Sequence, residues 1–155
     1  MKLKNNYKLE IITKDGNIEA QAPVIISASR STDIPAFYST WFMNRLREGY
    51  VKWINPFNQQ PLYISFVKTR VIVFWTKNAA PMMQYLDEID KIGKNYYFTF
   101  TVNDYEEEGL EPRVPPLKDR IKTFKQLSEK IGKSKVIWRF DPLILSKELT
   151  IDKLL

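Results

Sequence analysis

Polar side chains suited to ligand binding gather directly after four apolar runs of the 155-residue sequence. In parallel strand–helix folds, functional groups lie at the carboxyl ends of the strands, so such clusters meet along one rim of the sheet. We expect these clusters to bind a substrate or a cofactor, and we assign neither a catalytic residue nor a metal site. The candidate binding residues are Arg30, Thr32, Asp33, Asn55, Lys77, Asn78, Thr101, Arg139 and Asp141.

Three of these candidates are cations, which indicates a negatively charged ligand. Helix caps need acceptor groups, and a cation at the start of a helix opposes the helix dipole, so capping does not explain Arg30, Lys77 and Arg139. Their positions predict a rim that binds a carboxylate or a phosphate. The alternative stays open that the Thr and Asp candidates only cap helices, and that Asp141 only pairs with a neighbouring arginine.

Composition narrows the chemistry further, because the sequence contains no histidine and no cysteine. Imidazole or thiolate metal sites, disulfides and Ser-His or Cys-His nucleophile pairs are therefore excluded within these residues. General acid–base chemistry falls to Asp, Glu, Lys or Tyr side chains. The net charge of +6 permits an anionic small molecule or a nucleic acid as partner. The basic residues are dispersed, however, as on an ordinary solvated surface.

The elements that must position these residues alternate along the chain. The four apolar runs have the length and composition of strands buried on both faces. They are Val24–Ala28, Val71–Trp75, Tyr96–Thr101 and Val136–Phe140. Helices are predicted from the Thr32–Asp33 cap to Gly49, over about Ala80–Ile92, over about Leu117–Ile131, and after Thr150. This alternation predicts a parallel sheet with helices outside it.

Apolar spacing assigns the large aromatic residues of these elements to the core. The buried stripe predicted for the first helix consists of Phe37, Trp41, Phe42 and Leu46. Trp75 and Trp138 take matching places on two strands, and we expect both to pack in the core. The alternative for these two residues is stacking on a substrate ring.

Two segments outside the alternation are predicted as hairpins. Residues 1–22 form an N-terminal arm whose strands flank the turn signal Asp15–Gly16. Tyr50–Ile54 and Leu62–Phe66 have the pattern of strands, and the connection Asn55–Pro61 is too short and too proline-rich for a crossover helix, which favours a hairpin or an irregular excursion. In an alternative interpretation, Trp53 and the Asn55–Asn58 turn form a lid. The acidic loop Asn103–Pro116 is expected to be solvated.

The predicted fold is α/β, with a partial (β/α) barrel over residues 23–155, parallel strands and outer helices, preceded by the hairpin arm. A complete barrel has eight strands and about 250 residues, so this chain supplies about half, and we expect it to be truncated at Leu155. The open edges of a half-barrel favour a homo-oligomer. The sequence has neither a secretion signal nor an apolar run of about 18 residues, so we expect a cytoplasmic protein without a membrane partner.

Five segments, in order along the chain, resemble an uncharacterised bacterial family, the domain of unknown function numbered 1848. They are Ile25–Tyr38, Trp41–Leu46, Asn55–Asn58, Val73–Asn78 and Val136–Pro142. The resemblance implies an intact protein longer than this chain, with a C-terminal cysteine cluster similar to the iron–sulfur motif of radical S-adenosylmethionine enzymes. It implies a 4Fe-4S cluster and S-adenosylmethionine as cofactors of that intact protein.

The resemblance also bears on the strand ends. Thr76–Asn78 and Arg139–Pro142 are similar to motifs of the spore photoproduct lyase branch of those enzymes. Because this chain has no cysteine, it cannot bind an iron–sulfur cluster, and we expect it to be inactive alone. The predicted function is the N-terminal half of a radical S-adenosylmethionine-like enzyme with an anion-binding rim. The alternative is a non-catalytic module that binds nucleic acid or phosphate.

Overall fold

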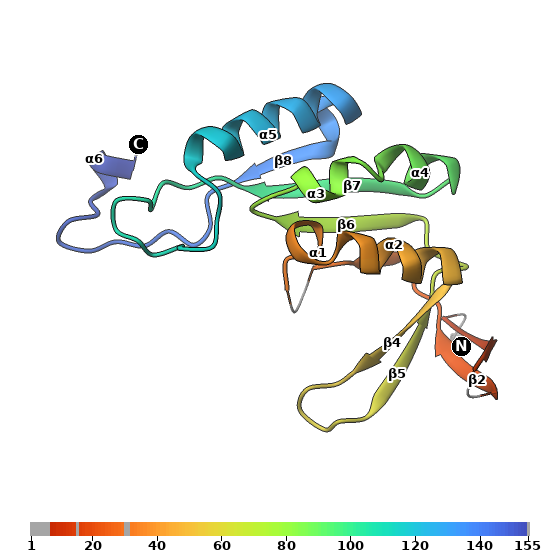
Figure 1. Ribbon diagram of the computed structural model, residues 1–155. Helices are drawn as coiled ribbons and strands as arrows, with labels where there is room; N and C mark the ends of the chain where they lie inside the picture. Colours follow the sequence, from red (N-terminus) through yellow and green to blue (C-terminus); the bar gives the residue numbers. More distant parts are fainter. Residues whose placement is uncertain (1–6, 15, 30–31, 155) are drawn as a thin grey trace, which may run out of the picture.

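A four-stranded parallel sheet forms the centre of the computed structural model, which describes residues 7–14, 16–29 and 32–154. Its strands run in the order β3-β6-β7-β8, and each pairs in parallel with its neighbour (Figure 1). The strands are β3 (Ile25–Ser27), β6 (Val71–Thr76), β7 (Asn95–Thr101) and β8 (Val136–Arg139). This order confirms the predicted parallel sheet and the four predicted strand positions.

Helices pack on one face of this sheet and enclose the core. They are α1 (Ile34–Phe37), α2 (Ser39–Glu48), α3 (Ala80–Met83), α4 (Leu86–Lys91) and α5 (Leu117–Ile131). A short 3₁₀ helix (Lys133–Lys135) precedes β8, and α6 (Ile151–Leu154) lies away from the sheet, beyond the loop that follows β8 (Figure 1). Alternate strand residues such as Phe74, Phe98 and Phe100 point to this face and are fully buried. Met43 of α2 and Leu127 of α5 pack in the same core cluster.

A second sheet joins the two predicted hairpins. Its strands are β1 (Lys8–Thr13), β2 (Gly16–Gln21), β4 (Tyr50–Ile54) and β5 (Pro61–Ser65), in the order β1-β2-β5-β4. The antiparallel pairs β1–β2 and β4–β5 confirm both hairpins. The link between them, a parallel pairing of Gln21 with Ile64, was not predicted, because neither residue carries a local signal for it.

The prediction that all four parallel strands are buried on both faces is wrong for the two outer strands. Ile25 of β3 is 62% exposed and Ile137 of β8 is 48% exposed. By strand register, both lie on the same sheet face as Trp75, opposite the helices, and Trp75 is itself 43% exposed. An apolar run alone does not reveal that a strand lies at the edge of a sheet.

Core packing was therefore the wrong prediction for Trp75 and Trp138. Trp138 is 61% exposed and lies on the helix side of β8, so the two indoles occupy opposite faces rather than matching places. Its Nε1 donates a hydrogen bond to the Val102 carbonyl at 3.0 Å.

Two predicted helices are each broken into two shorter helices. The first breaks at Tyr38, where the Ser39 hydroxyl donates to the Pro35 carbonyl at 2.6 Å, a local bond that bends helices. The break rotates the buried stripe of α2, so Trp41 is 45% exposed, contrary to prediction. Phe37 is exposed as well, while Phe42 and Leu46 are buried as predicted.

The segment 80–92 breaks between α3 and α4 in a similar way. The Tyr85 amide donates to the Met82 carbonyl, three residues back, which tightens this turn into 3₁₀ geometry. The Tyr85 hydroxyl also shares a hydrogen bond with Thr40 of α2. The buried face, with Met82, Leu86 and Ile89, continues across the break as predicted.

The described strands form open sheets, so the α/β class is confirmed while a closed barrel is not observed. The strands β3 and β8 end the parallel sheet on its two sides. None of the helices in the described ranges is both long enough and apolar enough to span a lipid bilayer.

The difference between the two faces of the parallel sheet predicts different responses to one substitution. Ile72→Ala, at a fully buried position of the helix-covered face, should lower the free energy of unfolding by about 2–5 kcal/mol. Ile137→Ala, on the open face, should lower it by about 1 kcal/mol or less. Urea denaturation of both variants checks this, and equal losses would show that the open face is covered in solution.

Candidate functional site

A cleft of about 540 Å³ opens at the carboxyl ends of β3 and β6, between the start of α1 and the loop before α5. Four predicted site residues line it, namely Thr32, Asp33, Lys77 and Asn78. The cleft also includes Phe37, Tyr38, Arg113 and neighbouring loop residues. We call this hollow the rim cleft.

Asp33 holds the floor of the rim cleft together. Its carboxylate caps α1 by accepting a hydrogen bond from the Ala36 amide at 3.0 Å. It also accepts from the Thr76 hydroxyl at 2.7 Å and from the Lys77 amide at 2.8 Å, both at the end of β6. The predicted cap is therefore confirmed, and three donors of the chain itself occupy this carboxylate.

Burial raises the pKa of the Asp33 carboxyl above its ordinary value, against the lowering effect of these hydrogen bonds and of the Lys77 charge. Asp33 thus works as a positioning group. It fixes the Thr32 segment beside the Lys77 segment.

Lys77 is already paired inside the cleft. Its amine forms an ion pair with Glu111 of the loop before α5, and both side chains are largely buried. Burial lowers the pKa of Lys77 and nearby Arg120 adds to this, while Asp141 and Asp33 act in the opposite direction. The second Glu111 oxygen is buried and accepts no hydrogen bond from the part of the chain that the structure describes.

Three other groups in the cleft keep free donors. Arg113 is exposed, and its guanidinium has no hydrogen-bond or ion-pair partner within the described ranges. The hydroxyl of Thr32 and the side-chain NH₂ of Asn78 are likewise unpartnered among these residues, although the Asn78 oxygen accepts from the Ala80 amide. Sequence reasoning missed Arg113, yet it is the one basic residue of the acidic stretch 103–116.

Arg120 anchors the loop that carries Glu111 and Arg113. Its side chain is 2% exposed and donates to the carbonyls of Asn103 and Pro115, each at 2.8 Å. These two residues lie near opposite ends of the loop, so one guanidinium closes it. The prediction that this loop is solvated is wrong for Asn103 and Tyr105, which are buried, while residues such as Glu106 and Arg113 are exposed.

Three other predicted site residues, Thr101, Arg139 and Asp141, do not line the rim cleft. Arg139 pairs with Asp141 at 2.8 Å, as one alternative predicted, and its guanidinium lies 4.2 Å from the centre of the Trp75 ring. Thr101 is buried beside Arg139 in the sheet register. This second group sits at the ends of β7 and β8.

A further candidate, Asn55, lies away from both groups. Asn55 stays in the β4–β5 turn, where its side chain accepts from the Phe57 amide at 2.9 Å, and Phe57 at the tip is 95% exposed. Arg30 lies outside the described residues.

The fold and the cleft together define an α/β domain with an open parallel sheet and a charged hollow at the carboxyl ends of its strands. A family model with the description Domain of unknown function (DUF1848) matches residues 25–155. The chain belongs to this family. The match starts at the first residue of β3, so β1 and β2 lie outside it. No curated protein and no solved structure matches the chain.

The raised pKa of Asp33 predicts how stability changes with acid. In the unfolded chain, Asp33 has the ordinary pKa of 3.8, and the folded chain has a higher pKa at this carboxyl. Just above pH 3.8, the folded chain therefore still binds a proton that the unfolded chain has lost. The free energy of unfolding, taken relative to Asp33→Asn, should therefore fall as the pH rises through this window and level off above it.

Urea titrations of both proteins across the acid range measure this difference. Glu10→Gln, at an exposed position of β1, controls for the loss of one negative charge. A difference that grows with rising pH would contradict the prediction and show that the hydrogen bonds to the carboxylate outweigh its burial.

Proposed function

We propose that the rim cleft binds a small molecule through a carboxylate or phosphate group. The observation that supports this most is the Arg113 guanidinium, which has no partner among the described residues and lines the same hollow as the donors of Thr32 and Asn78. Guanidinium groups bind both kinds of anion with two parallel, charge-assisted hydrogen bonds. The aromatic side chains of Phe37 and Tyr38, both exposed at the cleft, offer contact for the rest of such a ligand.

The pair Lys77–Glu111 sets how much charge the cleft offers. With the pair closed, Glu111 neutralises Lys77 and Arg113 is the remaining cation among the described cleft residues. An incoming anion that replaces Glu111 gains the Lys77 amine. Because the second Glu111 oxygen is buried without a donor among the described residues, displacing Glu111 from Lys77 also removes an unfavourably buried acceptor.

The resemblance to radical S-adenosylmethionine enzymes extends the proposal to an enzyme built from a longer chain. An iron–sulfur cluster is bound by cysteine thiolates, and this chain has none, so its residues do not fit the cluster. No reaction step through that group follows from these residues. In such an enzyme, the contribution of this domain is to hold the anionic group of a substrate or of S-adenosylmethionine.

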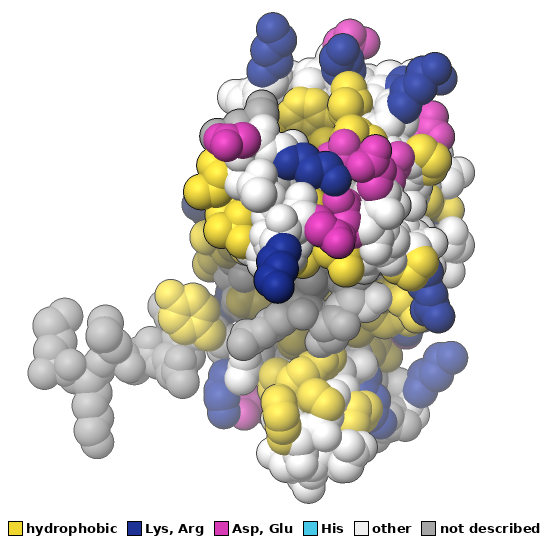
Figure 2. Space-filling view, turned by 90° about the vertical axis from the view of Figure 1, so that its left-hand side faces the viewer, with side chains coloured by type: hydrophobic (Ala, Val, Ile, Leu, Met, Phe, Trp, Pro, Cys, Tyr) yellow, Lys and Arg dark blue, Asp and Glu magenta, His cyan; other side chains and the backbone are white. Residues whose placement is uncertain are grey.

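The distribution of charge favours a small anion over a nucleic acid. On the face toward which the parallel strands point, Lys and Arg side chains intermingle with Asp and Glu (Figure 2). Ion pairs such as Arg139–Asp141 and Lys153–Glu107 account for part of this mixture. A polynucleotide needs a continuous basic track along its phosphates.

The proposal predicts that Arg113→Gln weakens anion binding. Isothermal titration with inorganic pyrophosphate and with citrate should show a loss of about 10- to 100-fold for at least one of them, as expected for one charge-assisted contact. Lys122→Gln, at an exposed position of α5, removes the same charge outside the cleft and should change affinity little.

A single-stranded oligonucleotide titrated in parallel tests the alternative function. Equal losses in the two variants, or no binding of either small anion, would overturn the proposal. Tight oligonucleotide binding with a steep salt dependence would overturn it in favour of a nucleic-acid module.

The lowered pKa of Lys77 makes a separate prediction about pH. Its amine loses its charge at a lower pH than the ordinary lysine value of 10.5, so anion affinity should decline before that value is reached. Lys77→Arg, whose guanidinium stays charged, should keep the affinity constant over the same range. Parallel declines in the two proteins would show that Lys77 does not contact the anion.

A further inference from the structure

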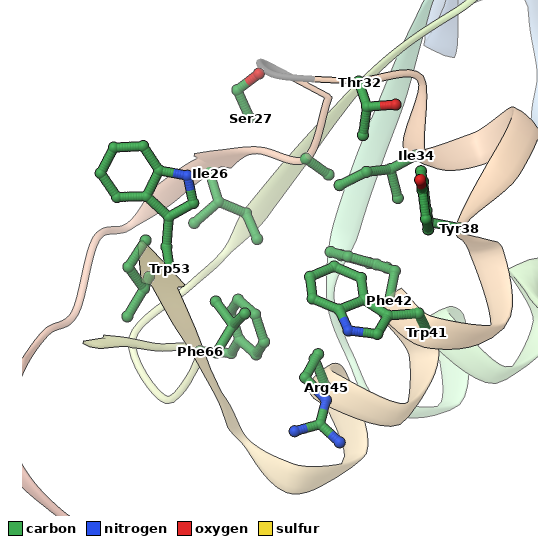
Figure 3. Close-up of a pocket in the computed structure, with 13 residues that line it drawn as sticks. Ile26, Ser27, Thr32, Ile34, Tyr38, Trp41, Phe42, Arg45, Trp53 and Phe66 are labelled. Carbon is green, nitrogen blue, oxygen red and sulfur yellow. The ribbon is translucent and has the colours of Figure 1, made fainter. Parts of the chain in front are cut away.

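A second hollow, of about 360 Å³, lies between α2 and the β4–β5 hairpin, beside β3 (Figure 3). Trp53 from β4 and Trp41 from α2 contribute indoles from its two sides, and Tyr38 stands at the start of α2. Phe42 and Phe66 form an apolar floor. We call this hollow the aromatic groove.

The exposure of its walls sets the aromatic groove apart from the core. Trp41 is 45% exposed, Trp53 is 37% exposed and Tyr38 is 50% exposed, whereas Phe42 on the floor is 3% exposed. Indoles are large apolar groups that folding normally covers. Apolar hollows of about 300–1,000 Å³ with few polar groups are typical of sites for small molecules. Trp faces on both sides of such a hollow suit a planar ring.

Arg45 supplies a polar group at the end of the groove. Its Nη1 pairs with Glu48 at 2.7 Å. Its Nε is buried and has no hydrogen-bond partner in the ranges that the structure describes. The Arg45 side chain as a whole is 34% exposed, so a ligand reaches the guanidinium through the part that stays exposed rather than through the buried Nε. A guanidinium can donate two parallel hydrogen bonds to the two oxygens of a carboxylate.

We propose that the aromatic groove is a second binding site, for a planar aromatic molecule that carries a carboxylate. The ring lies against Trp41 and Trp53, and the carboxylate accepts hydrogen bonds from the exposed part of the Arg45 guanidinium. This site shares Thr32 and Tyr38 with the rim cleft, but its ring-binding and anion-binding residues are different. The proposal therefore stands independently of the function proposed for the rim cleft.

The test follows the four indole N–H resonances of the ¹⁵N-labelled chain during titration with 2-naphthoate, after assignment with single Trp→Phe variants. The resonances of Trp41 and Trp53 should shift with one saturating curve. Those of Trp75 and Trp138, outside the groove, should stay in place. Movement of all four resonances alike, or of none, would overturn the proposal.

Variants of Arg45 test the carboxylate contact. Arg45→Gln should lower the affinity for 2-naphthoate by about tenfold or more. The affinity for the neutral 2-naphthylmethanol should stay the same. Arg45→Lys keeps the positive charge but removes the planar guanidinium, so it should also lower the affinity for 2-naphthoate. Arg47→Gln is the matched control, because Arg47 lies on the same helix and pairs with Glu88 outside the groove.

Further measurements distinguish binding in the aromatic groove from binding in the rim cleft, and test whether the ligand must contain a planar ring. Equal effects of Arg45→Gln and Arg47→Gln would overturn the carboxylate contact. Loss of 2-naphthoate binding in Arg113→Gln would place the molecule in the rim cleft and overturn the groove. Cyclohexanecarboxylate should bind more weakly than 2-naphthoate, and equal binding would overturn the preference for a planar ring. Thermal melts establish that each variant is folded.

Discussion

The carboxylate of Asp33 is the interaction on which the arrangement of both hollows depends. It joins the start of α1 to the end of β6 through the Ala36 amide, the Thr76 hydroxyl and the Lys77 amide. These partners bring together two chain segments that are 43 positions apart at Asp33 and Thr76. The carboxylate is partly withdrawn from water, so its hydrogen bonds offset an unfavourable burial. These hydrogen bonds hold Thr32, next to Asp33, beside Lys77.

The segment from Thr32 to Tyr38 then serves two hollows of different character. One side of it faces the paired charges of the rim cleft, and the other side faces the indoles of the aromatic groove. The break at Tyr38 turns Trp41 out of the core and toward the groove. On the opposite wall of the cleft, Arg120 donates hydrogen bonds to both ends of the loop that carries Arg113 and so fixes the position of that loop.

The sequence predicted those features whose causes are local. The Asp33 cap, the strand positions, both hairpins and the stop of α2 at Gly49, which has a φ of 86°, all follow from signals within a few residues. The partners of site residues did not follow, because they are distant in sequence. Glu111, 34 positions from Lys77, lies in a loop that was expected to face water.

Exposure was the other feature that the sequence did not predict. Trp41 fits the helical stripe only if the helix continues through Tyr38, and the Ser39 hydroxyl breaks that continuity. Ile137 looks like a core residue until β8 is known to be the outermost strand. Four of the eight site candidates that the structure describes share one cleft, because the strand ends converge. Arg113, which keeps free donors among the described residues of that cleft, was missed.

The parallel pairing of Gln21 with Ile64 has a consequence for the order of assembly. The β1–β2 hairpin closes locally, but its attachment to the second sheet requires β5, which is synthesised much later. Closing such a long segment has an entropic cost that a short hairpin does not face. The arm therefore cannot take its place in the second sheet before β5 has been made, and the lower cost of local closure favours formation of the β4–β5 hairpin ahead of this attachment.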